Sequence, residues 1–202
     1  MNVALFDYGA GNLHSLKKGL EAGGGTVGIT PDWREALAAD VLVLPGVGSF
    51  GAAVRALQGH QEEVRERLEG GLPCLGICLG MQLFFDESEE GEGTGIGLFP
   101  GRVRRLKGRR VPQMGWNDVT FGDDPVLAGT STGEGFVAYY ANSFVCEPSD
   151  GNAGVIAWSE YEGERFPAAV RRGRTVGVQF HPEKSSSGGL RLLRNFLHEA
   201  AR

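Results

Sequence analysis

The sequence predicts an α/β protein with an open, mostly parallel sheet flanked by helices and with antiparallel strands appended to it. Two observations carry this prediction. In the first half of the chain, short apolar runs alternate with segments whose apolar residues recur at helical spacing, as in parallel strands joined by helices. From residue 101 to residue 180, strand-like segments follow one another without helices, which favours antiparallel hairpins. No linker or repeat interrupts the 202 residues, so we expect one domain, 1–202.

The early elements are expected to alternate. Apolar runs predict strands at 3–8, 27–30, 41–44 and 72–77, and the third and fourth lack polar alternation, which indicates burial on both faces. Helical spacing predicts helices at 12–22, 32–39, 51–58, 61–69 and 79–87. In the fourth helix, Val64 and Leu68 form the apolar face. Sheets of this kind bind ligands beyond the carboxyl ends of their strands, so the residues that follow each strand are the functional candidates.

The later elements are expected to be mostly strands, at 102–106, 119–121, 135–145, 154–158, 168–171 and 175–180. We expect these strands to form antiparallel hairpins appended to the parallel sheet. A final helix is predicted at 189–200, where Leu190, Leu193, Phe196 and Leu197 share one face. That face should close the domain by packing on the sheet.

Composition excludes several classes of function. No run approaches the roughly 20 apolar residues that cross a bilayer, and the chain does not start like a secretory leader, so we expect no membrane contact. Three cysteines, an odd and sparse set, argue against disulfides and favour a cytoplasmic protein. A net charge of −5 opposes general nucleic-acid binding. The basic run 102–110 fits a solvated hairpin face, with countercharge from 86–92, better than the alternative of an RNA-binding patch.

The strongest local feature is the segment 76–80, Gly-Ile-Cys-Leu-Gly, between an apolar strand and an apolar-periodic helix. Such a turn strains its central residue at a strand end, and the glycines let strand and helix approach closely. A helix N-terminus also favours the thiolate that attacks a carbonyl. We predict that Cys78 is a nucleophile; the alternative is a small buried apolar residue, as we interpret Cys74 and Cys146. Cys74 and Cys78 have no further Cys or His nearby, so no metal site is expected.

A thiolate nucleophile needs a basic partner, and His181 is the histidine that follows a predicted strand. Glu183 lies two residues further on, and residues i and i+2 of an extended segment project to the same side. Pro182 between them favours the extended form at His181. A carboxylate there can accept the imidazole N–H and stabilise the imidazolium. The sequence therefore predicts a Cys78–His181–Glu183 triad, with a purely structural His–acid pair as the alternative.

The loop 44–49 also follows a buried strand and precedes a helix. Gly46 and Gly48 allow its backbone amides to point at a ligand. We interpret Val47 and Gly48, with the amide of Leu79 after the nucleophile, as an oxyanion hole. A phosphate-binding turn and a plain tight turn are the alternatives, although the full dinucleotide fingerprint is missing.

Three segments together resemble the signature segments of the triad (class I) glutamine amidotransferases. They are 45–48 (Pro-Gly-Val-Gly), 76–82 (Gly-Ile-Cys-Leu-Gly-Met-Gln) and 180–183 (Phe-His-Pro-Glu), and their order and spacing agree over nearly the whole chain. The resemblance implies a flavodoxin-like sheet and no cofactor. It implies that glutamine forms a thioester with Cys78, that ammonia leaves with a proton from His181, and that water releases glutamate. The positions it assigns to substrate binding are Gly46, Gly48, Gln82, Asn142 and Ser143.

Further segments, 7–13, 114–117 and 181–185, narrow the resemblance to glutaminase subunits that pass ammonia to a (β/α)8-barrel cyclase subunit in histidine biosynthesis. The resemblance places Asn12, Met114, Trp116 and Lys184 on the face of the resulting heterodimer. Met114 and Trp116 could instead belong to the core. The chain departs from the family pattern at Gln113, Asn142 and Phe144, where His, His and Tyr are usual.

Two other functions stay open. A stand-alone hydrolase, such as a Cys-His peptidase or a γ-glutamyl hydrolase, could use the same turn, and it would act without a partner. A non-catalytic binding module could keep the fold, and its Cys78 would not be labelled by a glutamine-like electrophile.

Overall fold

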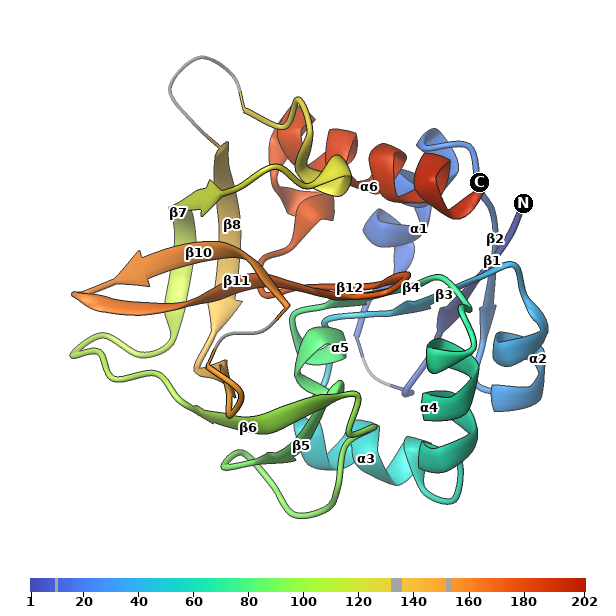
Figure 1. The fold of residues 1–202 in the computed structure, drawn as a ribbon, viewed down its shortest axis with the longest axis horizontal. Coiled ribbons are helices and arrows are strands. Elements are labelled where there is room, and N and C mark those ends of the chain that lie inside the picture. The colour runs from blue at the N-terminus through green and yellow to red at the C-terminus, as the bar shows by residue number, and fades with distance from the viewer. Residues whose placement is uncertain (10, 132–135, 152–153) are drawn as a thin grey trace.

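The computed structural model describes residues 1–9, 11–131, 136–151 and 154–202. Its larger sheet has nine strands in the order β2-β1-β3-β4-β12-β11-β10-β7-β8, and a second sheet has three strands in the order β5-β6-β9 (Figure 1). The parallel half consists of β1 (Asn2–Phe6), β2 (Thr26–Thr30), β3 (Val41–Leu44), β4 (Cys74–Ile77) and β12 (Thr175–Val178). The antiparallel half consists of β11 (Glu164–Arg172), β10 (Val155–Tyr161), β7 (Gln113–Phe121) and β8 (Phe136–Asn142).

Helices cover both faces of the parallel half. Their bounds are α1 (His14–Ala22), α2 (Trp33–Ala38), α3 (Phe50–Leu57), α4 (Gln61–Glu69), α5 (Leu79–Gln82) and α6 (Ser186–Ala200). One core cluster packs α1 and α6 against the sheet, and a second packs α2, α3 and α4 against its other face. In β3 the side chains alternate between the two clusters, with Val41 and Val43 in one and Leu42 and Leu44 in the other. The predicted burial of this strand on both faces is confirmed.

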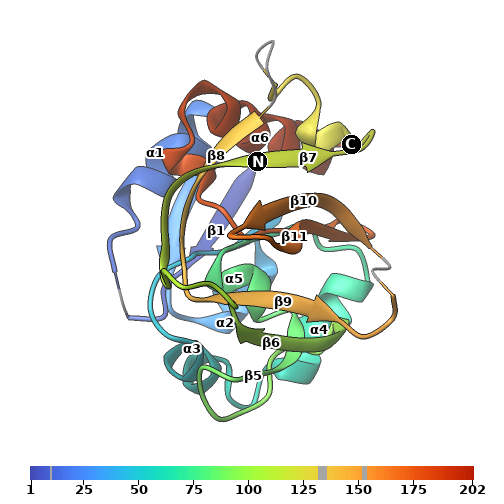
Figure 2. The ribbon, with the colours of Figure 1, turned by 90° about the vertical axis from the view of Figure 1, so that its left-hand side faces the viewer.

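The small sheet lies below β10 and β11 in Figure 2. It consists of β5 (Phe85–Ser88), β6 (Phe99–Arg105) and β9 (Phe144–Pro148). The predicted helix at 79–87 is therefore wrong beyond Gln82. The carbonyl groups of Leu83 and Phe84 accept hydrogen bonds from the backbone of Ile96 and Leu98, which ends the helix and starts a strand. A short apolar run does not by itself distinguish these two outcomes.

Three later predictions also need correction. The strand predicted at 135–145 is two strands, β8 and β9, which meet at Ser143 and belong to different sheets, and residue 135 lies outside the described residues. The strand at 119–121 is the end of the longer β7. The strand predicted at 175–180 is shorter than expected. It corresponds to β12, which pairs antiparallel with β11 and also parallel with β4.

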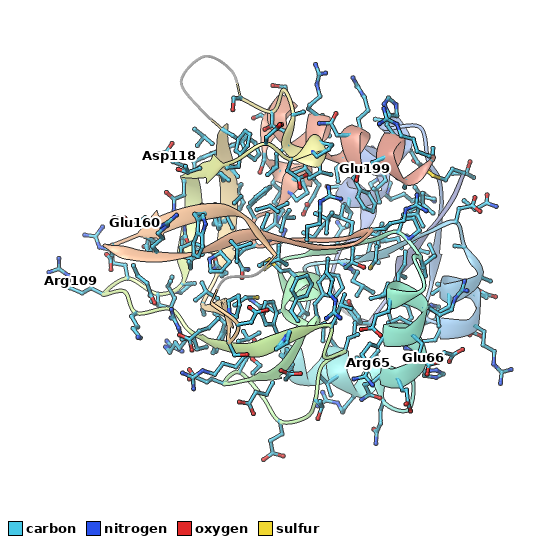
Figure 3. The ribbon with its side chains drawn as sticks, viewed as in Figure 1. Arg65, Glu66, Arg109, Asp118, Glu160 and Glu199 are labelled. Atoms are coloured by element: carbon cyan, nitrogen blue, oxygen red, sulfur yellow. The ribbon has the colours of Figure 1, made fainter. Side chains whose placement is uncertain are left out.

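The closing helix α6 begins earlier than predicted, at Ser186, and Leu192 takes the buried place expected for Leu190, which is 41% exposed. Its carboxyl end is tied to the sheet by Arg171 of β11, whose guanidinium binds Glu199 at 2.8 Å and Asp124 at 2.8 Å. Glu199 is labelled on α6 in Figure 3. No helix in the described part of the chain is both long and apolar enough to cross a membrane.

The junction of β4 with α5 has no room for side chains at its glycines. A Cβ on Gly76 would lie 2.6 Å from the carbonyl oxygen of Gly80, and a Cβ on Gly80 would overlap the carbonyl oxygen of Leu44 in β3. The backbones of β3, β4 and α5 are therefore in direct contact, as the sequence predicted for this turn. This contact fixes where α5 begins, and with it the position of Cys78.

We predict that Gly80→Ala lowers the free energy of unfolding by about 3 kcal/mol, because the new methyl group meets backbone that cannot move aside. Urea denaturation followed by circular dichroism measures the change. Gly28→Ala is the matched control, because a Cβ at Gly28 in β2 would meet no atom within 4 Å. Equal stabilities of the two variants would contradict the close contact.

Candidate active site

Cys78 occupies the strained turn between β4 and α5. Its φ of 49° and ψ of −103° lie in a region that residues other than glycine rarely adopt. The amide of Cys78 donates to the carbonyl of Val178 in β12 at 2.7 Å, and its carbonyl accepts from the amide of Gln82 at 3.1 Å. Bonds on both sides hold the strained conformation in place. The predicted turn is confirmed, but α5 has only four residues, so its dipole is that of a single turn.

His181 lies beyond the carboxyl end of β12, and its Nδ1 is 2.9 Å from Oε1 of Glu183. The segment is fixed to β8 because the amide of His181 donates to the carbonyl of Tyr139, and the amide of Tyr139 donates to the Ser185 hydroxyl. Only His181 itself is extended, and Pro182–Lys184 form a 3₁₀ turn, η2. The expectation of a fully extended segment is therefore wrong, although the two side chains do meet.

Gly46 shows how closely the cysteine and the histidine approach. A Cβ on Gly46 would lie 2.8 Å from Cβ of Cys78 and 3.0 Å from Cε1 of His181. Both side chains thus lie against the same glycine of the loop after β3. With Nδ1 directed at Glu183, the remaining ring nitrogen is available to Cys78.

The surroundings of His181 stabilise its protonated form. Burial acts to lower the pKa of the imidazole, but hydrogen bonds and charge interactions with Cys78 and Glu183 outweigh it and raise the pKa from 6.5 to about 9. An imidazolium next to a sulfur is the arrangement that favours a thiolate. Burial by contrast raises the pKa of the Cys74 and Cys146 thiols well above their ordinary value.

A cavity of about 180 Å³ opens at Cys78. It is lined by Gly46, Gly48, Cys78, Leu79, Gln82, Glu90, Ala141, Asn142, Ser143 and Phe144. Every position that the resemblance assigned to substrate binding lies on this wall. Glu90 supplies the one carboxylate among the lining residues that the structure describes. The cavity is smaller than a typical drug-sized pocket, so it suits a small ligand.

Of the three residues predicted to form the oxyanion hole, two line the cavity and one does not. Gly48 and Leu79 line the cavity, and Gly48 has a φ of +99°, which favours glycine. Val47 is not among the lining residues; its side chain packs against the core and closely faces Gly11. The role of the Val47 amide stays a prediction.

Cys78 is thus a strained cysteine at a small cavity, with His181 and Glu183 beside it. Residues 4–200 match the model of the family described as glutamine amidotransferase class-I. The imidazole glycerol phosphate synthase subunit HisH of Gloeobacter violaceus is 45% identical, over 99% of this chain and 90% of that protein. The HisH subunit of Thermus thermophilus is 46% identical, over 96% of this chain and 95% of that protein. The chain belongs to the class I glutamine amidotransferases, in the HisH family.

Solved structures support the fold of this amidotransferase. PurLQS from Thermotoga maritima superposes with a TM-score of 0.77 at 21% identity and 98% coverage of both chains. A crystal structure of a glutamine amidotransferase superposes with a TM-score of 0.75 at 22% identity and 99% coverage of both chains. The predicted α/β class is thereby confirmed.

Two residues of the amidotransferase site were missed from the sequence. Glu90 was grouped with the acidic run 86–92, but its Oε2 accepts from the amide of Phe50 at 3.0 Å, so it lies at the start of α3 and reaches the cavity. Gln179 was counted only as part of a strand. It is fully buried, and its Nε2 lies 3.4 Å from Sγ of Cys78. A polar side chain in a buried apolar run was the available signal.

The proposed partner face is exposed rather than part of the core. Met114 is 64% exposed and Trp116 is 55% exposed, on the outer side of β7. The Trp116 ring meets Tyr139 of β8 edge-on at 6.0 Å, and the Lys184 ammonium lies 5.7 Å from the same tyrosine ring. Asn12 is exposed, and its Oδ1 accepts a hydrogen bond from the amide of His14, the first residue of α1. The core alternative for Met114 and Trp116 is therefore wrong.

Two arginines of the basic run 102–110 form ion pairs. Arg102 and Arg104 both bind Glu147 of β9, and Arg104 also binds Glu164 of β11. The acidic run 86–92 contributes less countercharge than expected, and Glu89 is the residue that pairs with Arg102. Arg109 points away from the body of the protein in Figure 3. The described arginines of the run thus favour a solvated hairpin face, in agreement with the prediction.

We predict that the imidazole of His181 stays protonated up to about pH 9. Since contact with Cys78 is among the causes that raise this pKa, Cys78→Ala should move the midpoint to lower pH. Imidazole ¹⁵N chemical shifts followed from pH 5 to pH 10 measure both midpoints, with the exposed His198 as an internal reference. A midpoint that Cys78→Ala leaves in place would contradict the coupling of the pair.

Proposed function

We propose that this chain is the glutaminase subunit of imidazole glycerol phosphate synthase. It hydrolyses glutamine to glutamate and ammonia through a thioester on Cys78, and the ammonia passes to a cyclase subunit in histidine biosynthesis. The observation that carries the proposal is the convergence of Cys78, His181 and Glu183 at one small cavity with a carboxylate on its wall. Membership of the HisH family supports the same assignment.

We propose a group for each step of the reaction. The Cys78 sulfur attacks the carboxamide carbon of glutamine, and the carbonyl electron pair moves to oxygen, where the amides of Leu79, Val47 and Gly48 are the proposed donors. As the C–N bond breaks, His181 gives its proton to the nitrogen, and ammonia leaves. Water then attacks the thioester and gives a proton to His181. The C–S bond breaks with its electron pair returning to sulfur, and glutamate is released.

Glu183 acts through His181. Its carboxylate accepts the hydrogen bond from Nδ1 at 2.9 Å, which leaves Nε2 as the nitrogen that exchanges protons at Cys78. Because Glu183 stabilises the imidazolium, it keeps a proton ready for the departing ammonia. We therefore propose Cys78 and His181 as catalytic residues and Glu183 as the residue that orients them.

Recognition of glutamine as an amino acid requires an anion for its ammonium group, and Glu90 fits this role. Gly46, Gly48, Gln82, Asn142 and Ser143 are the remaining proposed contacts. They line the same cavity as Cys78.

We predict that Glu90→Gln raises the KM for glutamine by about ten- to a hundredfold, the effect of losing a hydrogen bond to a charged group, and changes kcat little. Gln keeps an acceptor for the Phe50 amide, so the loop should stay in place. Steady-state release of glutamate measures both constants. Glu87→Gln, an exposed position of the same acidic run, is the control. An unchanged KM would remove Glu90 from the binding site.

We propose a heterodimer with a (β/α)8-barrel cyclase subunit, in which Asn12, Met114, Trp116 and Lys184 contribute to the contact. The exposed aromatic and aliphatic side chains of this face are the kind that interfaces bury. Val137 of β8, 43% exposed and two residues from Tyr139, extends the same face. A cytoplasmic location fits three unpaired cysteines.

We predict that Cys78→Ser abolishes glutamine-dependent synthesis by the complex and leaves ammonia-dependent synthesis intact, because the thiol serves only to produce ammonia. Assays of the complex with each nitrogen source measure the two activities. Loss of both would contradict the proposal. Rapid glutamine or peptide hydrolysis by the purified chain alone would favour the stand-alone hydrolase, and failure of a glutamine-like electrophile to label Cys78 would favour a non-catalytic module.

A further inference from the structure

Gln179 is a buried polar residue that the mechanism above leaves without a role. It follows β12, is fully buried, and directs its Nε2 at Sγ of Cys78 from 3.4 Å. We propose that Gln179 is a further catalytic residue: its amide N–H donates to the Cys78 sulfur, and Gln82 with the carbonyl of Phe144 holds that amide in the donating orientation. The proposal rests on the proposed function, because it assumes that Cys78 is the nucleophile.

The orientation of the Gln179 amide follows from its neighbours. A side-chain amide can present either an oxygen or an NH₂ group, but the Phe144 carbonyl can only accept. Nε2 of Gln82 therefore faces that carbonyl, at 3.2 Å. The same NH₂ group donates to Oε1 of Gln179 at 3.3 Å, which leaves Nε2 of Gln179 toward the sulfur. The opposite orientation would place an oxygen lone pair against the sulfur and break the contact with Gln82.

The sulfur has few other sources of stabilisation. Cys78 is only 7% exposed, and α5 offers the dipole of a single turn. A buried anion needs hydrogen bonds, and a bond to a charged acceptor is stronger than one between neutral groups. Cys74 shows the effect of burial alone, because burial raises the pKa of its thiol well above the ordinary value. Gln179 adds a donor to the sulfur, in addition to His181.

The hydrogen bond acts at two points of the reaction. It favours the thiolate before attack, when the electron pair is still on sulfur. In the thioester that pair forms the S–C bond and the sulfur is neutral. When water has added and the C–S bond breaks, the pair returns to sulfur, and the N–H of Gln179 again stabilises the anion. Without the Gln179 hydrogen bond, less thiolate should be present before attack, and release of glutamate should be slower.

The donor is also connected to the wall of the cavity. Gln82 and Phe144 both line it, and Nδ2 of Asn142 donates to the same Phe144 carbonyl at 3.1 Å. The polar wall that receives glutamine and the group that stabilises the nucleophile thus share one hydrogen-bonded chain. Gln82 consequently contributes to orienting Gln179 as well as to the proposed substrate contacts.

The test uses the full chain with its cyclase partner and the variants Gln179→Glu and Gln179→Met. The first presents a carboxylate to the sulfur, and the second keeps the length of the side chain without a donor. We expect kcat for glutamine to fall about ten- to a hundredfold, the effect of losing a hydrogen bond to a charged group, with KM changed less than about twofold. The pH midpoint for alkylation of Cys78 by iodoacetamide, followed by mass spectrometry, should rise, most strongly in Gln179→Glu.

Gln113→Met is the matched control. Gln113 is also a buried glutamine, 2% exposed, but its amide has no hydrogen-bond partner among the residues that the structure describes. We expect this variant to keep both the wild-type kcat and the wild-type alkylation profile. If the Gln179 variants behave like wild type, or if Gln113→Met causes the same losses, the proposal is overturned.

Two further measurements distinguish a failure of the Gln179 proposal from misfolding of the variants and from a failure of the proposed function. If the Gln179 variants do not fold, Gln82→Leu still tests the orientation, because the released Gln179 amide should donate less and the alkylation midpoint should rise; an unchanged midpoint would contradict the proposal. If the wild-type complex releases no glutamate from glutamine, the proposed function fails. The alkylation profiles need no glutamine, so they report on the contact between Gln179 and Cys78 in either case.

Discussion

The candidate site depends on the parallel pairing of β4 with β12. These strands run in register from Cys74 opposite Thr175 to Ile77 opposite Val178, and the amide of Cys78 continues the ladder by donating to the carbonyl of Val178. The residues that follow the two strands must therefore lie next to each other, although Gln179 and Cys78 are 101 residues apart in the sequence. A shift of this register by one residue would turn every side chain to the opposite face of the sheet and separate the sulfur from the imidazole.

The second constraint is the set of glycines around Cys78, which allow close contacts. Gly46 lies against Cys78 and His181, Gly80 touches the backbone of β3, and a Cβ on Gly177 would lie 2.7 Å from Cγ of Met81. Each glycine allows its backbone to approach another backbone or a side chain within a distance that a methyl group would prevent. The positive φ of Cys78 is maintained by this packing and by the ladder bond to Val178.

The sequence alone was sufficient to predict the features that depend on neighbouring residues in the chain. Apolar periodicity predicted β3 and α4 with their observed bounds, and the glycine turn with its cysteine predicted the strained residue. Apolar periodicity could not predict the features that depend on distant parts of the chain. The helix ends after Gln82 because the backbone of Ile96 and Leu98 binds Leu83 and Phe84. The apolar run around Ser143 is divided between two strands of different sheets. Glu90 and Gln179 were missed for the same reason, since their positions at the cavity and the sulfur depend on contacts with Phe50 and Cys78 rather than on their neighbours in the chain.

The three cysteines differ in how readily peroxides oxidise them. Cys74 and Cys146 are fully buried as neutral thiols, whereas Cys78, although only 7% exposed, lines the cavity and lies beside His181, whose pKa is raised to about 9. Peroxides react with accessible thiolates far faster than with buried thiols. Oxidative damage is thereby directed to one sulfur, which lies at the wall of the cavity. On the proposed mechanism, oxidation of Cys78 stops the supply of nitrogen, and a reductant that reaches the cavity restores it.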